Sequence, residues 1–167
     1  MGTPAKHHIP DRFHSITPYL CVKDAAKAID YYKDVFGAEE IYRMPVPDGR
    51  IGHAEIMIGN SILMLGDEFP EQDVKSPIGY GGTPVRCMVY VKDCDAVLTK
   101  AGKMGGVITM PASDMFWGDR FGSFTDPFGH EWSVATHVED LTPEEIAQRQ
   151  EEAEGHHDDC GGCGHEH

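Results

Sequence analysis

The 167-residue sequence predicts an α+β fold in which one βαβββ module occurs twice in tandem. Three separated landmarks in the first half each recur 69 residues later, which indicates a duplicated module rather than chance similarity. The pairs are Val22-Lys23-Asp24 with Val91-Lys92-Asp93, Gly37 with Gly106, and Asn60 with Gly129.

The first module is expected at residues 13–66. Asp24 can cap the helix that follows it, and Gly37 supplies the left-handed backbone position that ends this helix. The dipeptide Gly59-Asn60 between two apolar runs predicts a tight hairpin turn. The expected elements are a strand at 15–22, a helix at 25–36, and strands at 39–46, 51–58 and 61–66.

A linker rich in proline, glycine and charge is expected at residues 67–82, before the second module at 83–138. The segment Thr142-Pro143-Glu144-Glu145 is a capping box, which predicts a short helix within 139–154. The second module should contain a strand at 85–91, a helix at 94–104, and strands at 107–110, 120–125 and 130–137. Residues 1–12 and 155–167 are expected to be flexible flanking segments.

Composition limits the classes of function. An apolar fraction of 40% and a charged fraction of 25% are typical of a globular protein. The absence of a long apolar run or a signal peptide predicts a cytoplasmic protein, and five cysteines without such a signal argue against a disulfide framework. The net charge of −14 is concentrated after residue 138, so neither nucleic acid nor a membrane surface is an expected partner.

Two local motifs resemble the vicinal oxygen chelate superfamily, which includes glyoxalase, bleomycin-resistance and extradiol dioxygenase proteins. They are Val22-x-Asp24 with Ala28-Ile29-x-Tyr31-Tyr32-x-x-Val35-Phe36-Gly37-Ala38, and Asp126-Pro127-Phe128-Gly129-His130-x-Trp132. The resemblance covers about residues 16–140. It implies an open, eight-stranded, barrel-like sheet around a cavity, commonly in a homodimer, and leaves open whether one chain or two exchanged modules complete the barrel.

The same resemblance places the family's metal ligands at Thr17, Met64, Arg86 and Ser133. Members that bind a divalent metal carry His, Glu or Gln at such positions, because these side chains offer suitable lone pairs. Arg86 would repel a cation, and Met64 suits only soft metals. The chain therefore resembles a branch that is poor in metal ligands, and no metal is expected in the barrel.

Strand alternation predicts which side chains face the cavity. The Gly59-Asn60 turn places Glu55 opposite Met64, so His53 and Glu55 should share the cavity face. A similar argument brings Arg120, Gly122 and Phe124 to that face, alongside Ser133, Ala135 and His137. The expected ligand-binding residues are Tyr19, Met64, Arg86, Tyr90, Trp117, Arg120 and His137. Because two of them are arginines, an anionic ligand is favoured.

His53 and Glu55 allow three interpretations. They could act together as a general acid and base. Alternatively, Glu55 could pair with Arg86 or Arg120 inside the barrel, because a buried charge needs a partner. Finally, both residues could ligate a metal at a shifted site. Trp117 is similarly ambiguous, since it could close over a ligand or serve in the core or a dimer contact.

The C-terminal tail combines thiols and imidazoles at spacings that suit zinc or nickel. The expected ligands are Cys160, Cys163, His165 and His167. The neighbouring glycines argue against a preorganised site, so metal uptake there could be adventitious.

The sequence is compatible with three functions. The leading hypothesis is a glyoxalase- or bleomycin-resistance-like protein that binds a small molecule in its cavity without metal. The first alternative is a lyase, isomerase or dioxygenase-type enzyme of the same superfamily that uses His53 and Glu55. The second alternative is a metal-buffering protein that acts through the tail.

Overall fold

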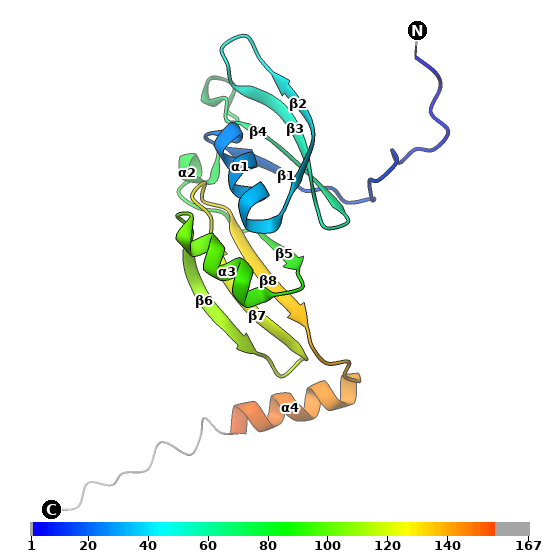
Figure 1. Cartoon of the computed structure of the whole chain (residues 1–167), viewed down its shortest axis with the longest axis vertical. Coiled ribbons are helices and arrows are strands. Elements are labelled where there is room, and N and C mark those ends of the chain that lie inside the picture. The colour runs from blue at the N-terminus through cyan, green and yellow to red at the C-terminus, as the bar shows by residue number, and fades with distance from the viewer. Residues whose placement is uncertain (1, 156–167) are drawn as a thin grey trace, which may run out of the picture.

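The computed structural model describes residues 2–155 and confirms the two tandem βαβββ modules (Figure 1). Module one comprises β1 (Tyr19–Val22), α1 (Ala25–Phe36), β2 (Glu39–Pro45), β3 (Ile51–Ile58) and β4 (Ser61–Asp67). The linker contains the short helices η1 (Pro70–Gln72) and α2 (Pro77–Tyr80). Module two comprises β5 (Arg86–Tyr90), α3 (Cys94–Lys103), β6 (Val107–Asp114), β7 (Asp119–Thr125) and β8 (Glu131–His137), and α4 (Pro143–Gly155) follows.

The two modules have the same strand order. Module one is ordered β1-β4-β3-β2 and module two β5-β8-β7-β6, with the first pair parallel and the others antiparallel. Within the described residues the two four-stranded sheets share no ladder, so they form an open arrangement rather than a closed barrel. In Figure 1 the modules lie one above the other, and α4 extends beyond module two.

Helices α1 and α3 begin where the sequence predicts and end within one residue of their expected ends, whereas the linker helices η1 and α2 were not predicted. The Asp24 side chain accepts a hydrogen bond from the Lys27 amide, and Gly37 adopts φ +66° after the last turn of α1. The Asp93 side chain caps α3 through the Ala96 amide in the same way. No helix of residues 2–155 is long and apolar enough to cross a membrane.

One core joins the two modules. The Tyr32 ring from α1 lies 5.3 Å from the Trp132 ring of β8, and the Phe36 ring lies 4.8 Å from Trp132. Tyr32 and Trp132 are almost completely buried. The Tyr32 hydroxyl also donates to Asp126 at 2.6 Å, which ties the first helix to the last hairpin turn.

The register of the last hairpin differs from the prediction. Ser123 lies opposite Ser133, and Phe121 lies opposite Ala135. Thr125 and Glu131 are the last facing pair, so an odd number of residues connects β7 to β8. The register therefore differs by one residue from the prediction, and the β7 side chains expected to face the cavity point toward α3 instead. The expected inward orientation of Arg120, Gly122 and Phe124 is therefore wrong, and Phe124 is fully buried in the core.

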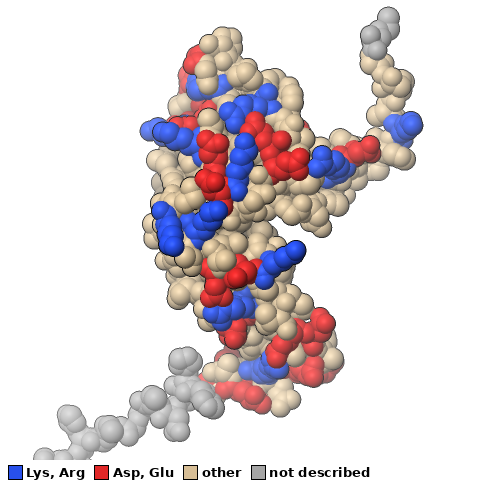
Figure 2. Space-filling view, in the orientation of Figure 1, with Lys and Arg blue, Asp and Glu red and all other residues tan. Residues whose placement is uncertain are grey.

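Charge is distributed as the sequence suggests. On the face shown in Figure 2, basic and acidic side chains alternate over both modules, and acidic side chains gather over α4. This face presents no continuous basic surface of the kind that nucleic acid requires.

Candidate functional site

Each sheet packs one face against its helix, and we call the opposite face the open face. On β1, Leu20 and Val22 are buried, whereas Tyr19 is 54% exposed. On β5, Met88 and Tyr90 are exposed on the open face, while the alternating residues are partly buried. The predicted orientation of these two strands is thus confirmed, and the open faces carry half-exposed aromatic and methionine side chains.

Three side chains on the open face of module one form a hydrogen-bonded chain, which we call the module-one cluster. The Tyr19 hydroxyl lies 2.9 Å from His53 Nδ1, and His53 Nε2 lies 3.1 Å from Glu55 Oε1. The His53 and Glu55 side chains are only 22% and 21% exposed. Met64 lies directly opposite Glu55, as the hairpin turn predicts. Partial burial, with a smaller contribution from Cys21, raises the pKa of Tyr19.

A hollow of about 630 Å³ adjoins the module-one cluster. Its walls include Thr17, Glu55 and Met64 on one side and Ile9 and Phe13 of the N-terminal segment on the other. The lining also includes His8, His14 and Ser15, so apolar side chains alternate with imidazole, hydroxyl and carboxyl groups. Apolar walls with several polar groups are typical of a small-molecule site.

A second cluster lies on the open face of module two, and we call it the module-two cluster. Asp119 Oδ2 accepts hydrogen bonds from the Tyr90 hydroxyl and the Trp117 indole N–H, each at 3.2 Å. Asp119 Oδ1 lies 2.7 Å from His137 Nδ1. The structure thus brings together three residues that the sequence predicts for the site, Tyr90, Trp117 and His137. Sequence reasoning missed Asp119 itself, because the wrong register directed its neighbour Arg120 inward.

The pKa of His137 is shifted by its neighbours in the module-two cluster and by Asp140. Its hydrogen bonds to Asp119 and then Asp140 raise its pKa, because both carboxyl groups favour the imidazolium form. A raised folded-state pKa gives extra stability that is fully present below the unfolded pKa, about 6.5, and is lost as pH rises through the folded pKa. The charged pair therefore stabilises the fold on the acidic side of neutrality.

We expect the melting temperature of the His137→Gln variant to fall furthest below that of the wild type under mildly acidic conditions. The gap should narrow as pH rises past the folded pKa of His137, because the imidazolium is then lost. Thermal denaturation of both proteins across this pH range measures the gap. A gap that stays constant would contradict an ionic role for His137.

Of the two arginines, only Arg86 lies on an open face as predicted, since it alternates along β5 with Met88 and Tyr90. Arg120 Nη2 binds Asp95 at 2.8 Å on the α3 side of the sheet, and Nη1 binds Asp114 at 3.0 Å. Arg86 pairs with Glu131 at 3.3 Å. Since both arginines bind other carboxylates and Glu55 binds His53, the interpretation that Glu55 pairs with either arginine is wrong.

The four positions that the resemblance assigns to metal ligands carry side chains that suit a divalent cation poorly. Arg86 brings a guanidinium group to one of them, and Ser133 is buried on β8. Across residues 2–155, no group of three or more His, Cys, Asp or Glu side chains is placed to hold a metal, so a shifted site at His53 and Glu55 lacks a third such ligand there. The expected tail ligands Cys160, Cys163, His165 and His167 lie outside the described residues.

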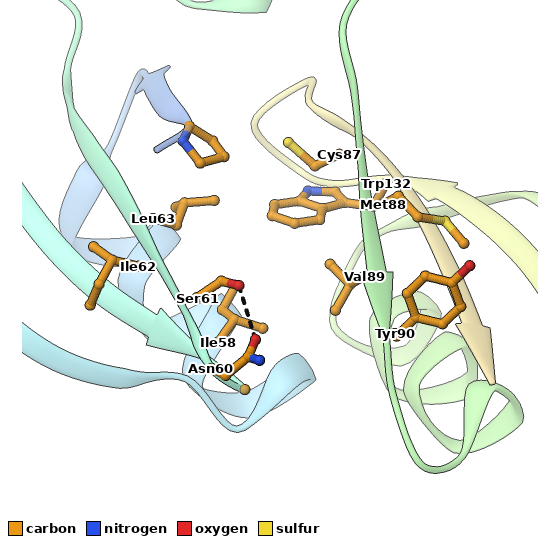
Figure 3. Close-up of a pocket in the computed structure, with 12 residues that line it drawn as sticks. Ile58, Asn60, Ser61, Ile62, Leu63, Cys87, Met88, Val89, Tyr90 and Trp132 are labelled. Carbon is orange, nitrogen blue, oxygen red and sulfur yellow. Dashed lines mark hydrogen bonds between the residues drawn. The ribbon is translucent and has the colours of Figure 1, made fainter. Parts of the chain in front are cut away.

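A separate apolar cavity of about 240 Å³ lies where the modules meet (Figure 3). The β3–β4 turn lines one side, and β5 with Trp132 lines the other. Cys87 and Val89, which point away from the open face, contribute to it together with Met88 and Tyr90. Local sequence patterns do not predict this cavity, because side chains from both modules line it.

The two tandem βαβββ modules are the fold of a glyoxalase-like protein. Comparison with known proteins establishes the family. Residues 12–134 match the family model of the Glyoxalase/Bleomycin resistance protein/Dioxygenase superfamily, so the chain belongs to this superfamily. An uncharacterised protein of Mycobacterium bovis is 39% identical over 135 residues, which cover 79% of this chain and 89% of that protein.

Solved structures show the same fold. PA1353 from Pseudomonas aeruginosa matches with a TM-score of 0.64 at 24% identity, over 75% of this chain and 99% of that one. TioX from Micromonospora sp. ML1 matches with a TM-score of 0.60 at 28% identity, again over 75% and 99% of the two chains.

Proposed function

We propose that the protein binds a small, neutral aromatic molecule on its open faces without the help of a metal ion. The observation that carries this proposal is the set of large apolar side chains left half-exposed around the two polar clusters. Their exposed fractions range from 44% to 63%, and they are Tyr19, Tyr42, Met44, Met88 and Tyr90. Exposed apolar surface around a few fixed polar groups is typical of a ligand site.

The charges near the clusters argue against the anionic ligand that the sequence favours. Glu55 and Asp119 place carboxyl groups at the two clusters, whereas Arg120 lies on the other side of its sheet. Arg86 is already paired with Glu131. A neutral ligand can accept or donate hydrogen bonds at the clusters without opposing these carboxyl groups.

Two fluorescent probes that differ by one sulfonate test this proposal. The full chain, treated with EDTA, should bind neutral N-phenyl-1-naphthylamine stoichiometrically and at least about tenfold more tightly than 8-anilinonaphthalene-1-sulfonate, which corresponds to about 1.4 kcal/mol. Tyr90→Ala should weaken binding of the neutral probe, whereas Tyr80→Ala, a control on the exposed linker helix, should not. Equal or tighter binding of the sulfonate would refute the preference for a neutral ligand.

The metal content of the same preparations separates this function from metal buffering by the tail. Protein purified without added metal is compared as the full chain and as a chain that ends at Gly155. Metal that is present only in the full chain would be bound by the tail, and the open faces would then bind their ligand without metal. Stoichiometric metal in the shorter chain would contradict metal-independent binding. Light scattering on these samples also tests the homodimer that the family resemblance implies.

A further inference from the structure

We propose that Tyr19, His53 and Glu55 form a proton relay through which Tyr19 removes a proton from an acidic C–H group of the bound ligand. The inference rests on the proposed function and adds a reaction to it. The ligand class becomes an aromatic or carbonyl-bearing carbon acid, and the reaction class becomes proton transfer.

The order of groups in the module-one cluster carries the inference. A carboxylate only accepts hydrogen bonds, so Glu55 fixes the His53 hydrogen on Nε2. Nδ1 then offers its lone pair to the Tyr19 hydroxyl, 2.9 Å away. Hydroxyl, imidazole and carboxylate thus follow one another as in catalytic triads, with a phenol in the place of the usual nucleophile.

Exposure determines which end of the chain reaches a ligand. Both His53 nitrogens are engaged and its side chain is only 22% exposed, whereas Tyr19 is 54% exposed. Gly66 leaves room beside the hydroxyl, since a Cβ atom there would lie 3.4 Å from the Tyr19 oxygen and 2.8 Å from the Gly52 carbonyl oxygen. The Tyr19 oxygen also lies 3.4 Å from that carbonyl, a longer contact than the one to His53.

The relay accounts for every proton and electron pair. The Tyr19 oxygen takes the ligand proton while the phenol proton passes to His53 Nδ1. The electrons of the broken C–H bond remain on the ligand and form a new double bond. His53 becomes an imidazolium ion, which Glu55 stabilises. Return of the proton through Tyr19 to another atom of the ligand completes an isomerisation without an oxidant or a metal.

The raised pKa of Tyr19 is consistent with this sequence of events. Partial burial raises the pKa of Tyr19 further above neutrality, so the resting phenol keeps its proton. Proton loss from Tyr19 is instead coupled to the arrival of the ligand proton. Glu55 acts as a positioning residue because it contacts His53 and not the reacting atoms.

The test uses 5-nitrobenzisoxazole, a neutral aromatic carbon acid whose ring opens to a coloured phenolate when a base removes its C–H proton. The wild-type full chain should open it faster than buffer does. Tyr19→Phe should lower kcat roughly 100-fold, because general bases typically contribute 10²–10⁴-fold. Glu55→Gln should lower kcat with little change in KM, and Tyr80→Phe should match the wild type.

Binding is measured separately, by displacement of N-phenyl-1-naphthylamine. If the benzisoxazole binds but opens no faster than in buffer, or if Tyr19→Phe retains full activity, the relay is overturned while the binding function stands. If it does not bind, ¹⁵N NMR of His53 in the free protein decides. An Nε2–H tautomer whose Nδ1 signal shifts in Tyr19→Phe would support the relay, and an Nδ1–H tautomer would overturn it.

Discussion

Replacing Asp126 by alanine is expected to lower the free energy of unfolding by roughly 4 kcal/mol, because it leaves several buried donors without an acceptor. Asp126 Oδ2 accepts from the Tyr32 hydroxyl at 2.6 Å and from the Trp132 indole N–H at 2.9 Å. Oδ1 accepts from the backbone amides of Phe128 and His130, both at 2.9 Å. Urea titration followed by circular dichroism measures the loss.

The Tyr32 bond makes this effect larger than that of an ordinary turn residue. Tyr32 lies on α1 and Asp126 on the last hairpin, so the bond crosses from one module to the other. Burial, reinforced by Asp126, raises the pKa of Tyr32 well above its usual value, so the phenol stays protonated and able to donate. Without its acceptor this hydroxyl would remain desolvated inside the core.

A double-mutant cycle isolates the contribution of this bond. Tyr32→Phe alone should cost about 1–2 kcal/mol, and Asp126→Ala should cost less in the Tyr32→Phe background than in the wild type. Asp30→Ala, on the exposed side of α1, should change stability by less than about 0.5 kcal/mol. Equal costs of Asp126→Ala in both backgrounds would show that Tyr32 and Asp126 are not coupled.

Local sequence patterns determine most of the fold. The caps at Asp24 and Asp93 and the two-residue turn at Gly59-Asn60 involve residues close in the chain, so the helices and the first hairpin could be predicted. The register of the last hairpin could not be predicted, because it depends on how many residues the turn around Asp126 contains. β6 also runs to Asp114, beyond the expected end at residue 110, with irregular pairing around Met110.

The candidate site was predictable only in part, because the orientation of its side chains depends on the register of each hairpin. Alternation along β1 and β3 predicts that Tyr19, His53 and Glu55 share one face, because the Gly59-Asn60 turn fixes the register of the β3–β4 hairpin. Because the predicted register of the β7–β8 hairpin was wrong by one residue, Arg120 was expected on the open face of module two, where Asp119 lies. The open face therefore carries a negative charge where a positive charge was expected. Contacts between modules, such as the cavity beside Trp132, follow from packing that no local pattern specifies.

Replacing Asp119 by alanine is expected to affect binding more than stability, in contrast to Asp126. The Asp119 side chain is only 5% exposed and orients Tyr90, Trp117 and His137. Tyr90 is 63% exposed and the His137 side chain 52%, so both can bind water when the carboxylate is removed. We therefore expect a loss of only about 1 kcal/mol in the free energy of unfolding.

Affinity should fall more steeply, because the freed side chains must be ordered again whenever a ligand binds. Ordering two or three side chains at about 0.5–1.5 kcal/mol each predicts an affinity for N-phenyl-1-naphthylamine that is about tenfold weaker. Fluorescence titration of Asp119→Ala measures this change, and Asp95→Ala, which removes the partner of Arg120 on the other side of the sheet, is the matched control. If Asp119→Ala binds the probe like the wild type, the module-two cluster is not part of the ligand site. If its stability falls as far as that of Asp126→Ala, Asp119 supports the fold rather than the ligand.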